Sequence, residues 1–430
     1  MPPRNHAQQT HSRKSATTSR RSADNSFDII VVGGGLAGLT TTCLLADAGL
    51  HVACIDREPP PATLQEVFDG RTTAISWGSR KVLEAAGIWH LINHVSCPIR
   101  QIDILDGDSP LLLSFNSEEV GGRTFGWIAE NLAIRKALYQ RVSQLKKAHH
   151  LAPALVKDYA VHDDHVEVQL GDDRRCQAQL VIGADGRQSF TRDWMGIGTR
   201  SWSYHQRALV CNVEHENPHD NIAVEHFHPT GPFATLPLFD SDTGKHRSSV
   251  VWTEHGDDKD SALHWDQVSF DAGLTARFPA RYGRVRQIGK RYSYPLGLIH
   301  AHDYIGPRMA LVADAAHGIH PIAGQGLNLG FRDIAELCTL ITQAYQQGND
   351  PGAPELLAHY QRQRRLDNIG MAGATDGLTR LFSNDLTPVR MARRLGLRAV
   401  AKFPPAKQFF MKQAMGAAGL LPALIRDQAA

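Results

Sequence analysis

The sequence is poor in cysteine, in net charge and in long apolar runs. Its 430 residues include six cysteines, none in a CxxC pair or grouped with histidines at metal-ligand spacing. We therefore expect reduced thiols and no metal site. The formal net charge is only +2, which gives no indication of nucleic-acid binding. No apolar run reaches the roughly 18 residues that a membrane-spanning helix needs. What remains is a globular protein of two or three domains.

The first 26 residues lack what a folded segment needs. They contain no Leu, Ile, Val or Phe and a single acidic residue, Asp24. Without an apolar stretch the segment is not a secretory signal. Its Arg- and Ser-rich composition resembles an organelle transit peptide, but it forms no amphipathic helix. We interpret residues 1–26 as a disordered basic tail and place the start of the fold at Phe27.

A buried strand and a glycine-rich turn open the folded part. The run FDIIVVGGGLAG predicts a short strand at Ile29–Val32, buried on both of its faces, followed by a tight turn. A helix over Leu39–Ala48 and a second strand over His51–Ile55 follow. This order of strand, turn, helix and strand predicts a parallel α/β sheet of the Rossmann type.

The turn has the composition of a dinucleotide-binding loop. Gly33 allows the sharp turn out of the strand, Gly35 lets the backbone approach a pyrophosphate, and Gly38 lets the helix pack closely on the sheet. Asp56 ends the second strand, where its carboxylate is placed to accept hydrogen bonds from an adenosine ribose. The position of the motif at the start of the fold favours FAD over NAD, although the motif alone leaves both open.

Two later segments again place an acidic residue at the end of a predicted strand. Leu180–Arg192 gives an apolar strand, then the sequence Ala-Asp-Gly-Arg with Asp185, then the start of a helix. Met309–Val312 is the second such strand, and Asp314 follows it. A proline- and glycine-rich loop at 321–326 then leads into another helix. Together with the first turn, these are three segments in which a buried strand leads into a turn and then a helix.

In this order and spacing the three segments resemble the single-component FAD monooxygenases that share the p-hydroxybenzoate hydroxylase fold. The resemblance covers residues 27 to about 340. It implies an α/β fold with a Rossmann-type FAD-binding domain, an inserted mixed β-sheet substrate domain and a C-terminal helical region. The implied boundaries are 27–100, 126–195 and 290–345 for the FAD-binding domain, 101–125 and 196–289 for the substrate domain, and 346–430 for the basic amphipathic helical region.

Further segments resemble the ubiquinone-biosynthesis hydroxylases within that class. They are Asp69–Trp89, Phe125–Leu138, Gly231–Leu238, Asp314–Ile334 and Tyr360–Asn368. The resemblance implies that FAD and O₂ hydroxylate the ring of a polyprenylated phenol through a flavin C4a-hydroperoxide, with NAD(P)H as the expected electron donor. No second GxGxxG unit is present, so NAD(P)H would bind without a Rossmann domain of its own. A small electron-transfer protein is the alternative donor.

The resemblance assigns the flavin ring to the loop before the predicted helix Leu327–Ala335. Pro321, Gly324 and Gln325 would lie against the ring, and no side-chain base is assigned. The positive end of the helix would stabilise negative charge on the reduced flavin. The residues expected to bind FAD are Gly33, Gly35, Gly38, Asp56, Arg71, Arg135, Asp185, Asp314, Gly326, Leu327 and Asn328.

Several of these candidates have a second interpretation. His317 and His320 invite an acid or base role, but we favour hydrogen-bonded supports of the loop and keep only His320 as a catalytic candidate. Arg71 and Arg135 would lie near FAD, or each would form a surface salt bridge. Asp185 would contact the cofactor, cap a helix N-terminus, or both.

Two details bear on the space around the cofactor and the substrate. Ala313 stands where the family usually has glycine, so a methyl group must fit beside the cofactor. Phe233, Leu236, Pro237 and Leu238 are predicted to line a pocket that would suit a prenyl tail. An ordinary sheet core explains these four residues equally well.

The C-terminal region combines basic and apolar residues. From Leu386 to Ala430 there are eight Lys and Arg and one acidic residue, Asp427. This composition is typical of an interfacial helix on an anionic membrane, or of a surface that docks ubiquinone-biosynthesis proteins. The alternative is a helix that packs on the FAD-binding domain and leaves a basic face in solvent.

The sequence therefore predicts a FAD-dependent ring hydroxylase of ubiquinone biosynthesis with a polyprenylphenol and O₂ as substrates. We expect it on the cytoplasmic side of a bacterial inner membrane, with the mitochondrial matrix side as the alternative. A hydroxylase of a small soluble phenol and a non-catalytic flavoprotein subunit of a quinone-synthesis complex are the competing hypotheses.

Overall fold

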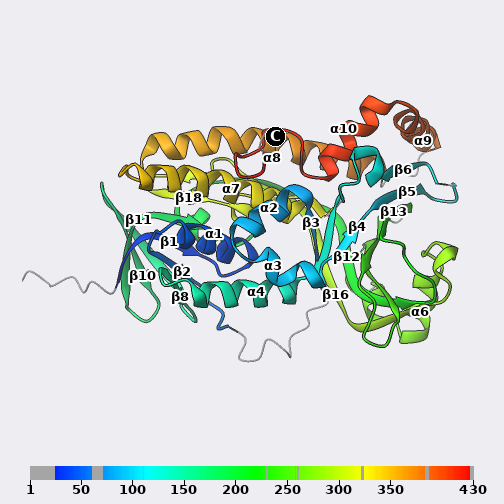
Figure 1. Ribbon diagram of the computed structural model, residues 1–430, viewed down its shortest axis with the longest axis horizontal. Helices are drawn as coiled ribbons and strands as arrows, with labels where there is room; N and C mark the ends of the chain where they lie inside the picture. The colour runs from blue at the N-terminus through cyan, green and yellow to red at the C-terminus, as the bar shows by residue number, and fades with distance from the viewer. Residues whose placement is uncertain are drawn as a thin grey trace, which may run out of the picture.

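The computed structural model describes residues 25–60, 71–109, 111–228, 231–256, 258, 261–320, 324–382 and 387–426. Its first sheet is built on parallel strands in the order β18, β11, β1, β2 and β8 (Figure 1). Their bounds are β18 Met309–Leu311, β11 Arg175–Gly183, β1 Ser26–Val32, β2 Val52–Ile55 and β8 Ala148–Leu151, with β17 Ile305–Gly306 antiparallel to β18 at the edge. The predicted Rossmann-type sheet is confirmed, and its first strand begins at Ser26.

Both faces of this sheet are buried. Helices pack on the face that contains Ile29 and Val31, and a hairpin that extends from β11 contributes to the core beneath Ile30 and Val181. The helices are α1 Leu36–Asp47, α4 Asn131–Gln144 and α7 Gln325–Gln346, and the hairpin strands are β9 Val156–Val161 and β10 Val166–Leu170. Because both faces are covered at the centre of the sheet, β1, β2 and the second half of β11 are continuous apolar runs with no alternation.

A second, mixed sheet forms the other half of the molecule (Figure 1). Its strands, in order, are β19 His317–Gly318, β16 Val285–Ala301, β12 Thr199–His215, β15 His246–His255, β14 Gly231–Leu238, β13 Ile222–His228, β5 Gln101–Asp106 and β6 Leu113–Asn116. The apolar stretches Ala208–Val213, Ile222–Phe227 and Ser248–Trp252 lie within β12, β13 and β15. β16 runs unbroken through the domain boundary predicted at residue 290, because it pairs with β12 along most of its length.

The two faces of the second sheet differ in burial. On what we call the closed face, α6 (Gln267–Thr275) packs over side chains that are almost fully buried: Leu209, Phe233, Val250 and Trp252. On what we call the open face, the side chains in the middle of the sheet are only half-buried: Val210, Glu225, Leu236, Val251, Tyr292 and Tyr294. The strand register places these six on one side because residues paired across neighbouring strands share a face.

This register corrects one expectation. Side chains alternate along β14, so Phe233 and Pro237 lie on the opposite face from Leu236 and Leu238. Phe233 is 1% exposed in the closed-face core, whereas Leu236 lies on the open face. The prediction that these four residues together line one pocket is wrong, because Phe233 packs in the closed-face core and Leu236 and Leu238 belong to a different cluster on the open face.

A small third sheet joins the two large ones. Its strands, in sheet order, are β3 Thr72–Ser76, β7 Gly126–Glu130 and β4 Cys97–Ile99. Along the chain, the helices α2 Trp77–Ala85 and α3 Trp89–Ile92 follow β3, and β6 precedes β7. The Thr72 hydroxyl donates a hydrogen bond to the Ser249 hydroxyl of β15, 2.8 Å away. Ser249 pairs with Leu236, so β3 lies against the open face.

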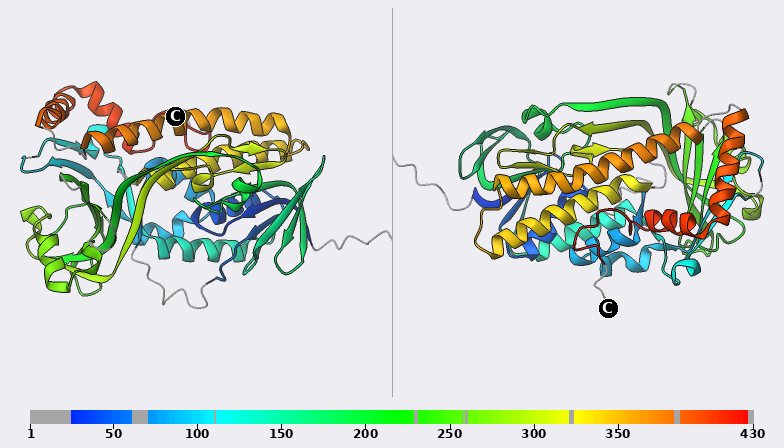
Figure 2. Two further views of the ribbon diagram at one scale, coloured as in Figure 1. Left: turned by 180° about the vertical axis from the view of Figure 1, so that it is seen from behind. Right: turned by 90° about the horizontal axis from the view of Figure 1, so that it is seen from above.

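The C-terminal helices extend from one sheet to the other. α8 (Pro354–Phe382) lies beside α7, and α9 (Thr387–Lys402) and α10 (Pro404–Ala414) continue from its end towards β6 (Figure 2). Among the described residues, no helix combines the length and apolar character needed to cross a membrane.

Candidate functional site

The carboxyl ends of four parallel strands bring the predicted site together. Val32 of β1 pairs with Gly183 of β11 on one side and with Ile55 of β2 on the other, and Gly183 pairs with Leu311 of β18. The carboxyl edge of an open α/β sheet is where ligands bind. Four of the predicted residues follow directly at this edge: Gly33, Asp56, Asp185 and Asp314.

The turn between β1 and α1 leaves room for a ligand. Gly33 has φ +107°, and a Cβ at this position would lie 2.5 Å from the carbonyl oxygen of Ala184. Gly35 is the N-cap of α1, and no side chain caps the helix there. A Cβ added to Gly35 would meet no described atom within 4 Å. The first N–H groups of α1 are therefore available to an anion at the helix N-terminus.

Two further glycines of this turn are required by close packing. A Cβ on Gly38 would lie 1.8 Å from the carbonyl oxygen of Gly33, so only glycine lets α1 begin this close to β1. A Cβ on Gly34 would lie 2.2 Å from Oδ2 of Asp56. The other carboxylate oxygen of Asp56 accepts a hydrogen bond from the backbone N–H of Glu58 at 3.0 Å. Gly34 was not predicted, because the motif itself leaves that position free.

Asp185 organises the loop before a short helix, α5 (Phe190–Trp194). Its Oδ1 accepts a hydrogen bond from the Ser189 hydroxyl at 2.5 Å, and its Oδ2 accepts one from the backbone N–H of Thr191 at 2.9 Å. Ser189 is itself the N-cap of α5 and accepts a hydrogen bond from the N–H of Arg192. The capping interpretation of Asp185 is thus favoured. Asp185 accepts a hydrogen bond from the first turn of α5 at Thr191 and also holds the N-cap residue Ser189. Its contact with the cofactor stays a prediction.

The methyl group of Ala313 fits at this position because the residue of α7 that faces it has no side chain. Ala313 has φ +53°, a left-handed conformation that glycine adopts more easily than alanine. The neighbouring residue on α7 is Gly330, where an added Cβ would lie only 2.7 Å from the Ala313 Cβ. The next residue, Asp314, has a half-exposed side chain, and Nε of Arg187 lies 4.0 Å from its Oδ2. The methyl group is accommodated on the helix side, so the strand end remains open for a ligand.

The flavin-ring loop is fastened to β3. Gly324 has φ +62° and is the N-cap of α7, and a Cβ there would lie 2.8 Å from the Cβ of Ala74. The Asn328 amide donates hydrogen bonds to the carbonyl oxygens of Ala74 and Gly324, both at 2.8 Å, and accepts one from the N–H of Ser76 at 3.0 Å. Both N–H donors of Asn328 are thus engaged within the protein. The structure shows a structural tie at Asn328, and its predicted flavin contact is untested.

The remaining residues of this loop divide between packing and open space. Leu327 packs against the main core, and Gln325 is 7% exposed. A Cβ on Gly326 would meet no described atom within 4 Å, and no side chain caps α7 at Gly324. As at α1, a helix N-terminus faces open space. Pro321 lies outside the described residues.

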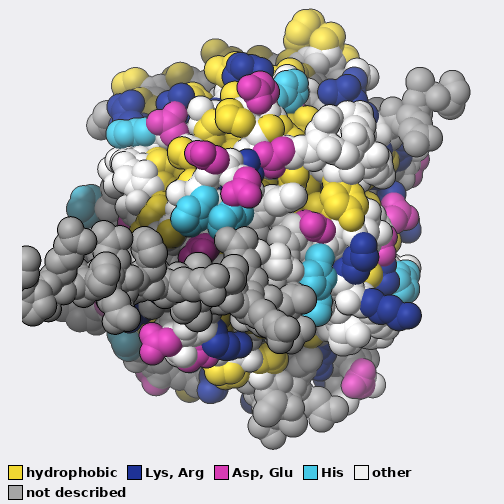
Figure 3. Space-filling view, turned by 90° about the vertical axis from the view of Figure 1, so that its left-hand side faces the viewer, with side chains coloured by type: hydrophobic (Ala, Val, Ile, Leu, Met, Phe, Trp, Pro, Cys, Tyr) yellow, Lys and Arg dark blue, Asp and Glu magenta, His cyan; other side chains and the backbone are white. Residues whose placement is uncertain are grey.

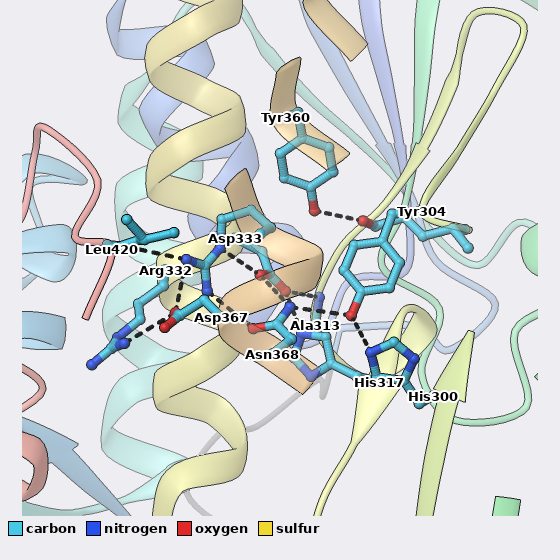
Figure 4. Close-up of polar contacts among 12 residues, drawn as sticks. His300, Tyr304, Ala313, His317, Arg332, Asp333, Tyr360, Asp367, Asn368 and Leu420 are labelled. Atoms are coloured by element: carbon cyan, nitrogen blue, oxygen red, sulfur yellow. Dashed lines mark hydrogen bonds and ion pairs between the residues drawn. The ribbon is translucent and has the colours of Figure 1, made fainter. Parts of the chain in front are cut away.

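His317 belongs to a buried ionic network (Figure 4). Its Nε2 lies 2.5 Å from Oδ2 of Asp333, and Nε of Arg364 lies 3.0 Å from Oδ1 of the same carboxylate. All three side chains are at most 1% exposed. Burial acts to raise the pKa of Asp333, but His317 and Arg364 outweigh it and lower that pKa to about 2. Asp333 also accepts a hydrogen bond from the N–H of Ala313 at 3.2 Å, so the network holds the strand end that carries Asp314.

The sequence analysis did not find this network, although its members occur in segments that carried the resemblance. Asp333 lies in the FRDI sequence, and Arg364, Asp367 and Asn368 lie in YQRQRRLDN. Arg364 also pairs with Asp367 at 2.9 Å. The sequence does not show that Asp333 and Arg364 form a pair, because their contact depends on the packing of α7 against α8.

The structure favours a supporting role for His317 and leaves His320 open. Burial, followed by the nearby Arg187, lowers the pKa of His320 to about 4, so its imidazole is neutral at pH 7. The ring packs edge-on against Tyr204, with centroids 5.1 Å apart. A neutral imidazole this deep is a poor acid, and the catalytic role suggested for His320 stays a prediction.

The two arginines differ in their surroundings. The guanidinium of Arg71 lies 6.0 Å from the ring centre of Tyr294 on the open face, and its carbonyl oxygen accepts a hydrogen bond from Asn131. Arg135 is half-buried on α4 and forms no ion pair with another described residue. For Arg135, the surface salt bridge proposed as its alternative is absent from the described part of the chain. Their contact with FAD stays a prediction.

These features fit FAD. Two helices, α1 and α7, present uncapped N-termini to open space, one beside the Gly33 turn and one beside the Gly324 loop. A dinucleotide that carries a pyrophosphate and a ring able to hold negative charge suits such a pair. The residues that would hold it are Gly35 and Asp56 at one end, Asp314 between, and Gly324 and Gly326 at the other.

Comparison with known proteins decides the family. The model of the FAD-binding domain family matches residues 26–370. The chain belongs to this family. It is 46% identical over 401 residues to ubiquinone hydroxylase UbiL of Rhodospirillum rubrum, covering 93% of this chain and 92% of that protein. It is 33% identical to 3-demethoxyubiquinol 3-hydroxylase of Escherichia coli (90% and 98% covered) and 31% identical to the human mitochondrial ubiquinone biosynthesis monooxygenase COQ6 (91% and 93% covered).

Solved structures confirm the fold. The p-nitrophenol 4-monooxygenase PnpA of Pseudomonas putida superposes with a TM-score of 0.75 at 18% identity, covering 91% of this chain and 99% of that one. The probable FAD-dependent monooxygenase pqsL of Pseudomonas aeruginosa gives 0.73 at 19% identity, with 87% and 99% covered. The predicted p-hydroxybenzoate hydroxylase-type architecture and its FAD cofactor are therefore confirmed.

One cluster of potential metal ligands lies away from this edge, on the β9–β10 hairpin. Ligand atoms of His162, His165 and Glu167 lie within 4.8 Å of one another. Figure 3 views the end of the molecule that carries this hairpin, where acidic, basic and histidine side chains are interspersed. No metal site was expected from the sequence, and this cluster lies apart from the carboxyl edge of the parallel sheet.

Proposed function

We propose that this protein is a FAD-dependent monooxygenase that hydroxylates the ring of a polyprenylated phenol in ubiquinone biosynthesis. One observation carries the proposal: the Gly324 loop touches Ala74 of β3, and β3 in turn binds Ser249 on the sheet's open face. The cofactor edge of one sheet therefore adjoins the accessible face of another. The names of the relatives supply the substrate class.

The residues of this chain would bind the cofactor, orient it and stabilise the charge that develops on it. When bound, FAD would take two electrons from a reductant and activate O₂, so that one oxygen atom enters the ring and the other leaves as water. The N-terminus of α1 would hold the pyrophosphate, Asp56 the ribose, and Asp314 a hydroxyl of the ribityl chain. The N-terminus of α7 would stabilise negative charge that develops beside Gly324 and Gly326.

An assay with purified holoenzyme tests this proposal. The protein would be loaded with FAD and supplied with NAD(P)H, isotopically labelled O₂ and a prenylphenol in detergent. We expect one labelled oxygen atom in the ring of the product. Hydroxylation of a free phenolic acid, with the prenylphenol untouched, would favour the soluble hydroxylase instead. FAD binding without any hydroxylated product would favour the non-catalytic flavoprotein.

We further propose that α9 and α10 bind an anionic membrane surface, on the cytoplasmic side of a bacterial inner membrane. Of the α9 residues, Arg393 is buried, while Met391 and Leu395 are 67% and 70% exposed. Phe403, Phe409 and Phe410 add exposed apolar surface at α10. An exposed apolar surface among basic residues is typical of an interfacial helix, and a polyprenylphenol resides in the bilayer.

Ion pairs hold this surface in place. Arg393 and Arg394 both bind the buried carboxylate of Asp106 on β5, with Nε of Arg394 2.8 Å from Oδ2. Lys407 lies 2.7 Å from Oε1 of Glu119. In the alternative predicted from the sequence, all basic side chains would remain in solvent. Arg393, Arg394 and Lys407 instead form ion pairs with the protein.

Vesicle sedimentation tests the membrane proposal. The holoenzyme should sediment with vesicles that contain anionic lipids, and Leu395→Glu should weaken this binding about tenfold, because a carboxylate would enter the interface. Leu155→Glu is the matched control, since Leu155 is 61% exposed at a site far from α9. Equal binding by both variants would contradict the proposal, and a stable complex with another pathway protein in their place would favour protein docking.

A further inference from the structure

The open face of the second sheet carries a carboxyl group that the account so far does not use. Glu225 lies in the middle of β13, paired with Ala234 of β14 and with Ile104 of β5. Ala234 pairs in turn with Val251. This register places the Glu225 side chain on the face that meets β3 and not on the face that α6 covers.

Apolar side chains surround this carboxyl group. Two residues before it, Ala223 packs in a cluster with Leu238 and Met411. Two residues after it, Phe227 stacks on Phe382 of α8, with ring centroids 3.7 Å apart. The C-terminal helices therefore cover the sheet on both sides of Glu225.

Glu225 faces accessible space on the open face of the second sheet. Its neighbours on the same face, Ala223 and Phe227, are both 6% exposed, whereas Glu225 stays half-buried. Burial nevertheless raises the pKa of the Glu225 carboxyl to about 7. The Glu225 carboxyl group therefore keeps accessible surface between two buried neighbours on the open face.

This space adjoins the flavin-ring loop. The cluster that contains Ala223 also includes Ala74 and Leu236, and Ala74 is the residue against which Gly324 packs. A substrate ring that lay between the loop and the open face would present its polar group to an apolar wall with one carboxyl group in it. A substrate site built in this way fixes orientation with few polar contacts.

We propose that Glu225 is the catalytic base that binds and deprotonates the ring hydroxyl of the phenolic substrate. The inference rests on the function proposed above. As the new C–O bond forms at the ring carbon, using a π-electron pair of the ring, the O–O bond of the oxygen that FAD would activate breaks. In the same step the ring O–H bond breaks and its proton moves to the Glu225 carboxylate. The ring then loses its C–H proton to solvent to regain aromaticity, Glu225 returns its proton to the ring oxygen, and the second oxygen atom leaves as water.

Three charged groups near Glu225 on this face have partners of their own. Asp106, two residues beyond Ile104 on β5, is held by Arg393 and Arg394 of α9. Arg247 of β15 lies 3.6 Å from Glu130 of β7. At the far side of the face, Arg71 lies over Tyr294 of β16, beside Tyr292. Burial is the only cause that acts on the pKa of Glu225, so none of these groups perturbs it.

Kinetics of Glu225→Gln test the proposal, with Glu225→Asp as the conservative variant and Glu84→Gln as the control. Glu84 is exposed on α2 and pairs only with Arg80. We expect Glu225→Gln to lower kcat about 100-fold while KM changes little, because a general base contributes that much. FAD content and flavin reduction should stay normal, and Glu225→Asp should recover part of the rate.

The pH profile separates chemistry from structural damage. Wild-type kcat/KM should fall as the pH decreases below about 7, where Glu225 becomes protonated. This acidic limb should be absent in Glu225→Gln. If the wild type hydroxylates the prenylphenol and Glu225→Gln keeps both its rate and the acidic limb, the role of Glu225 is refuted and the proposed function stands. If the wild type itself forms no product, the proposed function fails first.

Discussion

The FAD-binding sheet is covered on both of its faces, whereas the second sheet is fully covered on one face and only partly covered on the other. Ile29, Ile30 and Val31 of β1 are each 0% exposed, and only the strand ends remain available for chemistry. In the second sheet, Val250 is 0% exposed on the closed face, while its neighbour Val251 is half-buried on the open face. The first sheet offers an edge with helix N-termini, which suits an anionic cofactor, and the second offers an apolar wall, which suits a lipid-like ring.

The largest effect is expected from substitutions at the carboxyl edge of the FAD-binding sheet. Gly38→Ala should weaken FAD binding roughly 100-fold or more, because displacement of α1 misplaces the N–H groups that face the pyrophosphate. The new Cβ would lie 1.8 Å from the Gly33 carbonyl oxygen. Fluorescence titration of the apoprotein with FAD measures the affinity.

Gly35→Ala sharpens the same test. Its Cβ meets no protein atom within 4 Å, so the fold should persist and any loss of affinity would report the approach of the cofactor itself. Full FAD affinity in Gly38→Ala would show that the turn does not bind the cofactor.

The next effect concerns the network beneath the edge. Asp333→Asn should destabilise the protein by about 3 kcal/mol, because it removes the buried carboxylate that His317 and Arg364 share and leaves Arg364 only Asp367. Urea denaturation measures this loss. Asp350→Asn is the control: Asp350 is 40% exposed in its pair with Arg308, and surface pairs contribute at most about 1 kcal/mol.

The same carboxylate predicts a pH dependence. Because His317 and Arg364 outweigh burial and lower the pKa of Asp333 to about 2, its contribution to stability is fully present above the unfolded pKa of about 3.9. It is lost as the pH falls from there through about 2. The free energy of unfolding should therefore fall less steeply over this range in Asp333→Asn. Parallel curves for the variant and the wild type would contradict the assignment.

A comparison of adjacent valines tests the two faces directly. Val250→Ala should cost about 2 kcal/mol, because a closed core cannot refill the lost volume. Val251→Ala should cost less than about 1 kcal/mol and should instead raise KM for the prenylphenol, because its side chain borders the proposed substrate space. Thermal unfolding and steady-state kinetics of the pair measure both effects. Equal stability losses would show that the open face is ordinary core.

The smallest effect is expected where Ala313, which follows β18, contacts Gly330 of α7, because substitution of one residue should offset substitution of the other. Gly330→Ala should destabilise by about 2 kcal/mol, since its Cβ would crowd the Ala313 methyl group. In an Ala313→Gly background this loss should shrink to less than about 1 kcal/mol, because the methyl group is gone. Ala313→Gly alone should stabilise slightly, since φ is +53° there. Additive losses in the double variant would exclude the contact.

What the sequence predicted was mostly local. The Gly33–Gly38 turn, the strands that end before Asp185 and Asp314, and the helix after Gly324 depend on short-range backbone geometry that a sequence shows directly. The Asp333–Arg364 network and the position of Glu225 depend on which helix packs on which and on strand register. Such long-range pairings leave no periodic signal.

Phe233 and Leu236 show where the pattern was misread. The segment GPFATLPL is apolar at both positions, which suggested one pocket-lining surface. Alternation along β14 places the two residues in different environments, one under α6 and one on the open face. Only the register of neighbouring strands shows which residue lies on which side.

The most direct test is a structure of the protein with FAD and a prenylphenol bound. The account predicts the pyrophosphate at the N-terminus of α1, the flavin ring beside Gly324 and Gly326, and the phenol ring on the open face with its hydroxyl within hydrogen-bonding distance of Glu225. A phenol ring bound on the closed face or on the outer surface, away from the flavin, would contradict it.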